Sequence, residues 1–186
     1  FFEKTGYADY RLISETGFSE AELEKIEQIS GVQEAARYLT VTADVAEREG
    51  DSVALAVTTN PAVSGVLVMD GEDYDPQSEL LIPDHLQAYS DAGTYLVGDT
   101  LTLTYKSLSL TGKVRGLIKA GEYMVNVRDS SQLMPDYKTY GYAYISPVFY
   151  EKAAGAAFYP QIHVISDMDK QEFYDAADRA LGYTVL

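Results

Sequence analysis

The chain of 186 residues contains no cysteine, no tryptophan and only two histidines. Without cysteine it forms no disulfide, offers no thiolate ligand to zinc and has no thiol nucleophile. No run of about 18 apolar residues is present, so no segment has the pattern of a membrane-spanning helix. The sequence starts at Phe1 without an initiator methionine or a basic and then apolar leader, and we therefore expect a piece of a longer protein.

Positive charge is also scarce. The 14 lysine and arginine residues are outnumbered by 29 aspartate and glutamate residues, which gives a net charge of -15. Affinity for nucleic acid comes mainly from cations that neutralise phosphates, so we expect no nucleic-acid partner. An anionic lipid surface is disfavoured for the same reason. The simplest interpretation of the excess acid is a hydrated surface with a diffuse preference for cationic partners.

The residues that are present have the composition of a folded domain. Hydrophobic residues make up 46% of the chain and charged residues 23%, which is typical of globular proteins rather than of disorder. The length suits one domain with a substantial core. The 16 tyrosines suit strand-rich packing or a surface with amphipathic patches, because the tyrosine ring tolerates both burial and water.

Two segments, one near each end, carry the signals of a capped helix. Ser19 and Glu22 form a capping box, in which each side chain accepts a hydrogen bond from a backbone N–H at the helix start. Phe18 and Leu23 are spaced as a hydrophobic staple, and Gly31 predicts the end of the helix. The same signals recur near the other end at Met168, Asp169, Glu172, Phe173 and Gly182.

Apolar and polar residues alternate over much of the remaining chain, which predicts strands. The run 52–58 is continuously apolar instead, and it predicts a central strand that is buried on both faces. Alternation in 101–105 and again in 108–118 predicts a β-hairpin. A helical turn is expected at 83–89 and irregular structure at 121–140. The other predicted strands lie at 10–14, 39–45, 65–69, 79–82, 142–145 and 161–165.

The order of these elements predicts an α+β fold. Strand and helix patterns at both ends flank a β-rich middle, and such end units usually pack together. We expect residues 1–186 to form one domain with an α/β sandwich lobe built from both chain ends, residues 8–70 and 140–186. A β-rich lobe, residues 71–139, is expected to be inserted between them.

Four segments combine into a recognisable pattern. They contain, in turn, a first helix with an Ile-x-Gly-Val exit, a glutamate-led hydrophobic strand, a Gly-Asp turn into a strand, and a strand with a Val-x-Gly step. The segments are Gly17–Val32, Ser78–Pro83, Val97–Leu103 and Gly112–Ile118. In this order they resemble the MacB-like periplasmic core domain of FtsX-like ABC transporter permeases. The similar segments span most of residues 10–186, and 121–140 matches least.

The resemblance implies a porter-like α/β lobe with an inserted β lobe, held between the first two transmembrane helices of a bacterial permease. It implies a place at the cell membrane on the extracytoplasmic side, extracellular or periplasmic. The implied partners are a cytoplasmic ATPase subunit reached through the membrane part, a second permease copy or homologue, and an extracellular peptide, lipoprotein or wall-associated protein client. The implied role is transport by mechanotransmission, in which the domain contacts the client and relays ATPase-driven conformational change.

No catalytic set is evident from the sequence. His85 follows Pro83-Asp84 at a predicted helix start, and His163 lies in the middle of a predicted strand. A Ser-His-Asp triad on a nucleophile elbow needs a Gly-x-Ser-x-Gly motif, which does not occur. The segment 112–116 lacks the Lys-Ser/Thr pair of a phosphate-binding loop. We therefore predict no catalytic residue, no enzyme and no cofactor.

Two other clusters are candidates for binding. The acidic turn 70–75 lacks the ligand spacing of a calcium loop, so we interpret it as a hydrated turn and predict no metal site. The tyrosine-rich stretch does not belong to the family pattern, and its candidate client-binding residues are Tyr137, Tyr140, Tyr142 and Tyr144. Packing within a sheet is the competing interpretation of these tyrosines.

Two alternatives to the permease domain stay open at this point. The first is a free-standing surface domain that binds peptide or glycan, which a signal peptide and a wall anchor in the full-length protein would indicate. The second is an enzyme, which a metal-lined pocket at one of the two histidines would indicate.

Overall fold

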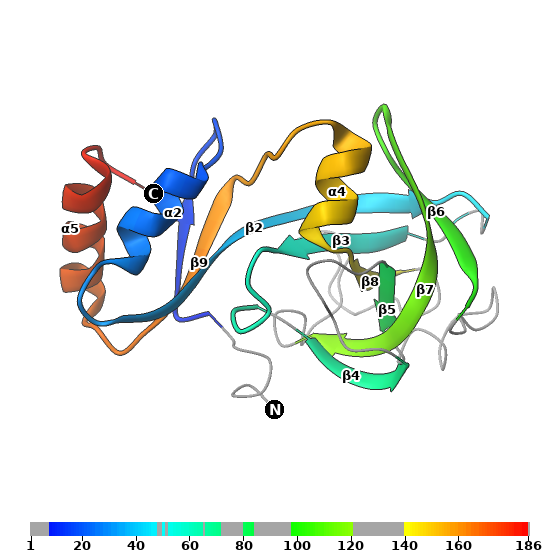
Figure 1. Cartoon of the computed structure of the whole chain (residues 1–186), viewed down its shortest axis with the longest axis horizontal. Helices are drawn as coiled ribbons and strands as arrows, with labels where there is room; N and C mark the ends of the chain where they lie inside the picture. Colours follow the sequence, from blue (N-terminus) through cyan, green and yellow to red (C-terminus); the bar gives the residue numbers. More distant parts are fainter. Residues whose placement is uncertain are drawn as a thin grey trace.

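The computed structural model describes residues 8–47, 50, 52–64, 66–71, 80–83, 98–120 and 140–185. In this part of the chain nine strands form one mixed sheet and three helices pack against it (Figure 1). The α+β class predicted from the sequence is therefore confirmed. Within the described ranges no helix is both long enough and apolar enough to cross a membrane.

The strands are hydrogen-bonded in the order β1-β9-β2-β3-β8-β5-β7-β4, and β6 pairs with both β2 and β7. The β3–β8 and β5–β7 pairs are parallel, and the other pairs are antiparallel. In chain order the elements are β1 Tyr10–Ile13, α2 Glu20–Glu27, β2 Val32–Val45, β3 Ser52–Thr58, β4 Val66–Gly71, β5 Leu80–Pro83, β6 Thr100–Tyr105, β7 Leu108–Ala120, β8 Tyr140–Tyr144, α4 Pro147–Ala154, β9 Gln161–Ser166 and α5 Lys170–Leu181.

The 14-residue strand β2 joins two halves of the sheet. Its first half pairs with β9, and its second half pairs with β3. Since β2 stands between β9 and β3 in the strand order, these two partners lie on its opposite edges. The two pairings overlap only at Tyr38, which lies opposite Gln161 on one edge and Thr58 on the other. In Figure 1 the strand runs across the molecule from one half to the other.

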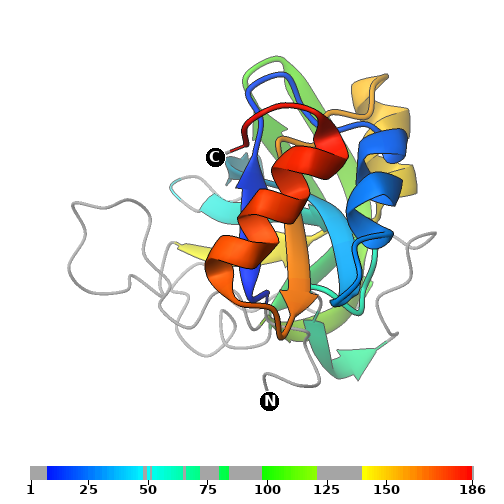
Figure 2. The ribbon, with the colours of Figure 1, turned by 90° about the vertical axis from the view of Figure 1, so that its left-hand side faces the viewer.

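The first half of β2 belongs to a layer that two helices cover. Helices α2 and α5 lie side by side on one face of β1, β9 and β2 (Figure 2). Phe173 of α5 is fully buried there, and its ring stacks on that of Tyr10 with centroids 4.6 Å apart. We refer to β1, β9, residues 32–38, α2 and α5 as the helix-covered half. Its core comprises Leu12, Phe18, Ile26, Ala35, Ile162, Val164, Phe173, Ala177 and Leu181.

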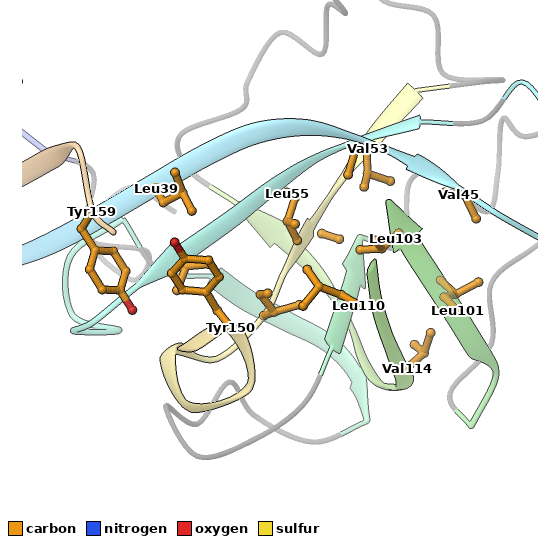
Figure 3. Close-up of a cluster of buried hydrophobic side chains, with 14 residues drawn as sticks. Leu39, Val45, Val53, Leu55, Leu101, Leu103, Leu110, Val114, Tyr150 and Tyr159 are labelled. Atoms are coloured by element: carbon orange, nitrogen blue, oxygen red, sulfur yellow. The ribbon is translucent and has the colours of Figure 1, made fainter. Parts of the chain in front are cut away.

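Five of the remaining strands close into a ring of pairings with the second half of β2, and the sixth, β4, pairs with β7 outside this ring. From the second half of β2 the hydrogen bonding passes through β3, β8, β5, β7 and β6, and β6 pairs again with β2 at Asp44 and Val45. We refer to this set as the strand ring. One hydrophobic cluster connects it, and helix α4 adds Tyr150 to that cluster (Figure 3). The strand members are Leu39, Ala43, Val45, Val53, Leu55, Val57, Leu101, Leu103, Leu110, Val114 and Ala143.

The predicted capping box at the start of α2 is confirmed. The Ser19 hydroxyl oxygen accepts a hydrogen bond from the Glu22 N–H at 3.2 Å, and the Glu22 carboxylate accepts one from the Ser19 N–H at 3.1 Å. The helix ends at Glu27, earlier than the predicted stop at Gly31. Gly31 instead has a φ of +100°, so it allows the turn from α2 into β2 that most side chains would resist.

Helix α5 is also confirmed at both ends. The Asp169 carboxylate accepts hydrogen bonds from the N–H groups of Gln171 and Glu172, and Gly182 ends the helix in the left-handed conformation. Helix α4 was not predicted. It begins after Ser146, whose hydroxyl accepts a hydrogen bond from a backbone N–H, and it ends at Gly155. These are ordinary start and stop signals, but α4 has eight residues and little apolar periodicity to reveal it.

The predicted strands are confirmed with shifted bounds. The strand expected at 39–45 extends back to Val32. All seven residues of β3 are buried, as the continuous apolar run predicts. The expected hairpin is the β6–β7 pair. The helical turn expected at 83–89 lies outside the described residues except for the end of β5, and so does most of the irregular segment 121–140. The division into lobes at residues 70 and 140 stays a prediction.

Removal of the capping box tests the start of α2. We expect Ser19→Ala to lower the free energy of unfolding by about 1 kcal/mol, because the Glu22 N–H loses its acceptor. Urea denaturation at neutral pH measures this change. The exposed Ser30→Ala serves as a control that is expected to change stability by less than about 0.5 kcal/mol. Equal stability of the two variants would contradict the assigned cap.

Candidate functional site

Four buried side chains gather where the two halves of the sheet meet. They are Tyr38 of β2, Ser64 from the loop after β3, Tyr144 of β8 and His163 of β9, each at most 2% exposed. We refer to these four residues as the waist cluster. Side chains alternate along a strand, and the neighbours of His163 face the core under α2 and α5. The waist cluster therefore lies on the other face of the sheet.

The waist cluster is linked by short contacts from one member to the next. Ser64 Oγ lies 2.6 Å from His163 Nδ1, and the Tyr144 hydroxyl donates a hydrogen bond to the Ser64 carbonyl oxygen at 2.8 Å. The hydroxyls of Tyr144 and Tyr38 are 3.2 Å apart. The Tyr38 ring stacks on the His163 ring with centroids 4.0 Å apart. These contacts form a closed circuit of four residues.

The hydrogen-bond partners of His163 fix its tautomer, and its surroundings fix its charge. Its Nε2 lies 2.7 Å from the Gln161 side-chain oxygen, which only accepts hydrogen bonds. Nε2 therefore carries the proton, and Nδ1 accepts from the Ser64 hydroxyl. Burial, and secondly the positive charge of Arg11 on the neighbouring strand, lower the pKa of His163 from 6.5 to about 3. His163 is thus neutral near pH 7.

The Ser64–His163 contact resembles the first two members of a hydrolytic triad, but its surroundings are structural. Both residues are buried, so a substrate carbonyl has no approach to the serine oxygen. The third partner is the neutral side chain of Gln161, not a carboxylate. Among the described residues no group of three histidine, aspartate or glutamate side chains is placed to hold a metal ion. Ser64 and His163 therefore serve here to pack and hydrogen-bond the strands of the sheet to one another.

The opposite face of β2 carries a second polar contact, made by Arg37, the residue before Tyr38. The Arg37 guanidinium lies over the ring of Tyr159, with its central carbon 4.7 Å from the ring centroid. It also donates a hydrogen bond to the Phe18 carbonyl oxygen at 3.4 Å and lies 4.0 Å from a Glu20 carboxylate oxygen. Burial raises the pKa of Tyr159. Arg37 thus ties the start of α2 to the segment that follows α4.

An apolar pocket opens between α4 and the turn that joins β6 to β7. Its volume is about 380 Å³, near the lower end of the range of small-molecule sites. Its lining includes Leu39, Leu55, Tyr105 and Tyr150. Phe158 also lines the pocket and is 43% exposed. Figure 3 shows Tyr150 beside Leu39 in the adjoining cluster. The pocket has the shape and polarity to take an apolar group.

The structure describes two of the sequence-predicted site residues in full. Tyr144 is completely buried within the waist cluster, so its side chain meets other tyrosine, serine and histidine groups rather than solvent. His163 belongs to the same cluster. Tyr140 and Tyr142 lie in β8, but their side chains fall outside what is described, as do Tyr137, His85 and residues 72–75. The role of the tyrosines in client binding stays a prediction.

Sequence reasoning did not find Ser64, Tyr38 or Arg37. Asn60-Pro61 and Ser64-Gly65 mark a turn in the sequence, but they do not indicate that Ser64 itself takes the left-handed conformation, with a φ of +51°, that non-glycine residues rarely adopt. Tyr38 and Arg37 lie before the segment whose alternation predicted a strand. Their partners are remote in sequence, and Ser64 and His163 are separated by 99 positions. Only the folded sheet brings these groups together.

Fold and site together define a mixed α+β domain in which buried polar side chains hydrogen-bond across one sheet. No protein-family model matches the sequence, and no curated protein matches it either. Solved structures do match. The extracellular domain of the noncanonic ABC-type transporter YknZ from Gram-positive bacteria aligns with a TM-score of 0.62 at 13% identity, over 93% of this chain and 91% of that one.

A second solved structure supports the same assignment of the fold. The periplasmic region of MacB from Actinobacillus actinomycetemcomitans aligns with a TM-score of 0.55 at 10% identity, over 94% of this chain and 84% of that one. The chain therefore has the fold of the extracytoplasmic domains of MacB-like ABC transporter permeases. The resemblance drawn from the sequence is confirmed at the level of fold.

The depressed pKa of His163 makes a prediction about stability and pH. Below about pH 6.5 the unfolded chain binds a proton at His163 that the folded protein does not bind until the pH approaches 3. The free energy of unfolding should therefore fall as the pH drops through this window, by up to about 1.4 kcal/mol per pH unit from this group.

Urea denaturation of the parent chain and of His163→Gln between about pH 7 and pH 5 measures this contribution. Other titrating groups are common to both proteins, so the difference in slope isolates His163. We expect the variant to be less stable near pH 7 and to lose less stability on acidification. Parallel slopes would mean that the folded protein protonates His163 as readily as the unfolded chain does.

Proposed function

We propose that the chain is the extracytoplasmic domain of a bacterial FtsX/MacB-like ABC transporter permease. The observation that carries this proposal is the similarity of fold over 93% and 94% of the chain to two such transporter domains. The similarity covers both chain ends and the middle together, so it concerns the whole arrangement rather than one common motif.

The proposed partners follow from the permease role. A cytoplasmic ATPase subunit acts on the domain through the membrane part, a second permease copy or homologue stands beside it, and an extracytoplasmic peptide or protein is its client. The domain contacts the client and passes on ATPase-driven conformational change. We propose the cell membrane as its location, with the domain on the extracytoplasmic side.

For the internal organisation we propose two lobes within one domain. Residues 8–70 with 140–186 form the porter-like lobe, and residues 71–139 form the inserted β-rich lobe. Strands β3 and β8 then connect the lobes, because they lie in the first lobe by sequence and take part in the strand ring by hydrogen bonding. Motion of one lobe would reach the other through these shared strands.

Client contact is proposed at the tyrosine-rich stretch. Tyr137, Tyr140 and Tyr142 carry aromatic rings that suit amphipathic contact with a peptide. Tyr144 contributes to client contact indirectly, because its buried side chain holds the end of β8 in place. The net charge of -15 favours a client with basic residues.

Chemical labelling of the full-length protein in intact cells tests the location. Residues 1–186 contain no cysteine, so in a full-length protein whose cysteines outside this range, where present, are replaced by serine, a single cysteine at the exposed Lys113 reports on this region alone. We expect Lys113→Cys to react with a membrane-impermeant maleimide without permeabilisation. Leu103→Cys is the matched control, because Leu103 is fully buried and should react only after denaturation.

Labelling only after permeabilisation would contradict an extracytoplasmic domain. A second measurement separates the permease from a free-standing surface domain. Purified in detergent, the full-length protein is expected to carry a co-purifying ATPase subunit whose ATP hydrolysis is measurable. Surface labelling without such an ATPase would favour the free-standing peptide- or glycan-binding domain.

Titration of the chain with a polybasic peptide tests the proposed client chemistry. We expect binding that weakens as salt rises, since screening reduces attraction between exposed charges. Tyr140→Ala combined with Tyr142→Ala should weaken binding at low salt, whereas Tyr150→Phe, a change within the core cluster, should not. Binding that is absent, or equal in all three proteins, would remove the tyrosine-rich stretch as a client contact.

A further inference from the structure

The backbone connection between the two halves of the sheet is narrow. The pairings of β2 with β9 and with β3 overlap at Tyr38 alone. The loop after β3 adds one backbone hydrogen bond there, from the Thr59 N–H to the Arg37 carbonyl oxygen at 3.1 Å. A strand that is paired on one edge and then on the other bends more easily at the change than a strand paired on both edges throughout. Side chains must therefore set the angle between the halves.

The waist cluster has members from both sides of this change. His163 comes from β9 in the helix-covered half, and Tyr144 comes from β8 in the strand ring. Ser64 links them, because its hydroxyl meets His163 at 2.6 Å while its carbonyl oxygen accepts from Tyr144 at 2.8 Å. Tyr38 completes the circuit through its stacked ring and its hydroxyl. Each contact is directional, so the circuit closes in one relative orientation of the halves.

We propose that the waist cluster is a latch that holds the helix-covered half and the strand ring in one relative orientation. All four side chains are buried, so water does not replace a bond that opens, and the latch is either closed or disrupted as a unit. The left-handed conformation of Ser64 fits this role. Its φ of +51° is strained for a serine and persists because the contacts of its hydroxyl and carbonyl hold it.

In the proposed relay of conformational change, the latch would be the part that transmits motion between the two halves. A displacement of the helix-covered half would be carried to the strand ring while the circuit is closed, and would be absorbed at Tyr38 once it opens. This consequence rests on the proposed function, whereas the orienting role of the latch does not.

Distance measurements between the halves test the latch. Lys170 at the start of α5 and Lys113 on β7 are both exposed, and the chain has no other cysteine, so Lys170→Cys with Lys113→Cys takes two spin labels at defined sites. We expect a narrow distribution of label distances in the doubly labelled parent. Tyr144→Phe removes the hydroxyl that joins Ser64 to Tyr38, and it should broaden that distribution and lower the melting temperature by several degrees.

Tyr150→Phe is the matched control. Its hydroxyl is also part of a buried side chain and donates to a backbone carbonyl, that of Phe158 at 3.0 Å, but it bridges nothing between the halves. It should lower the melting temperature and leave the distances unchanged. Tyr38→Phe, which loses only the 3.2 Å contact and keeps the stacked ring, should broaden the distribution less than Tyr144→Phe.

Two results would overturn the latch. One is an unchanged distance distribution in Tyr144→Phe and Tyr38→Phe, which would reduce the hydroxyls to a general contribution to stability. The other is equal broadening in Tyr150→Phe. Neither result depends on where the domain resides in the cell, so a failure of surface labelling and a failure of the latch are separate outcomes.

Discussion

The structure depends on one strand that serves two partners. Along its first half β2 pairs with β9, along its second half with β3, and the change of edge falls at Tyr38. Backbone hydrogen bonding therefore joins the two halves only at Tyr38 and at the neighbouring Arg37, whose carbonyl oxygen accepts from the Thr59 N–H. The strand nevertheless runs through both hydrophobic clusters, with Ala35 in the one and Leu39 in the other. Burial on both sides of Tyr38 keeps this long strand in place.

The side chains on both faces of β2 hold the two halves of the sheet together, but the interactions differ between the faces. On one face the Arg37 guanidinium lies over Tyr159 and reaches the Phe18 carbonyl, so cation and ring fasten the start of α2. On the other face the waist cluster is neutral and fully hydrogen-bonded. Apolar groups of the same size would pack as well, but they would tolerate sliding, whereas hydrogen bonds fix angle and register. Polar burial at this point thus specifies an orientation.

The fold resembles those of two transporter domains although the sequences are only 10% and 13% identical. A fold is set by the order of strands and by which face of each is apolar, and many sequences meet those conditions. Residues that set neither the strand order nor an apolar face are free to shape surfaces such as the pocket beside α4.

The sequence by itself determined the local structure. Ser19 and Asp169 begin their helices through contacts with residues two or three positions away, and alternation fixes which residues of a strand share a face. Tertiary structure decided the rest. The short helix α4 forms where Tyr150 is buried by the strand ring, and Ser64 meets His163 across 99 positions because β9 and β3 lie on either edge of β2. Such contacts leave no local pattern, since they arise only from the order in which the strands pair.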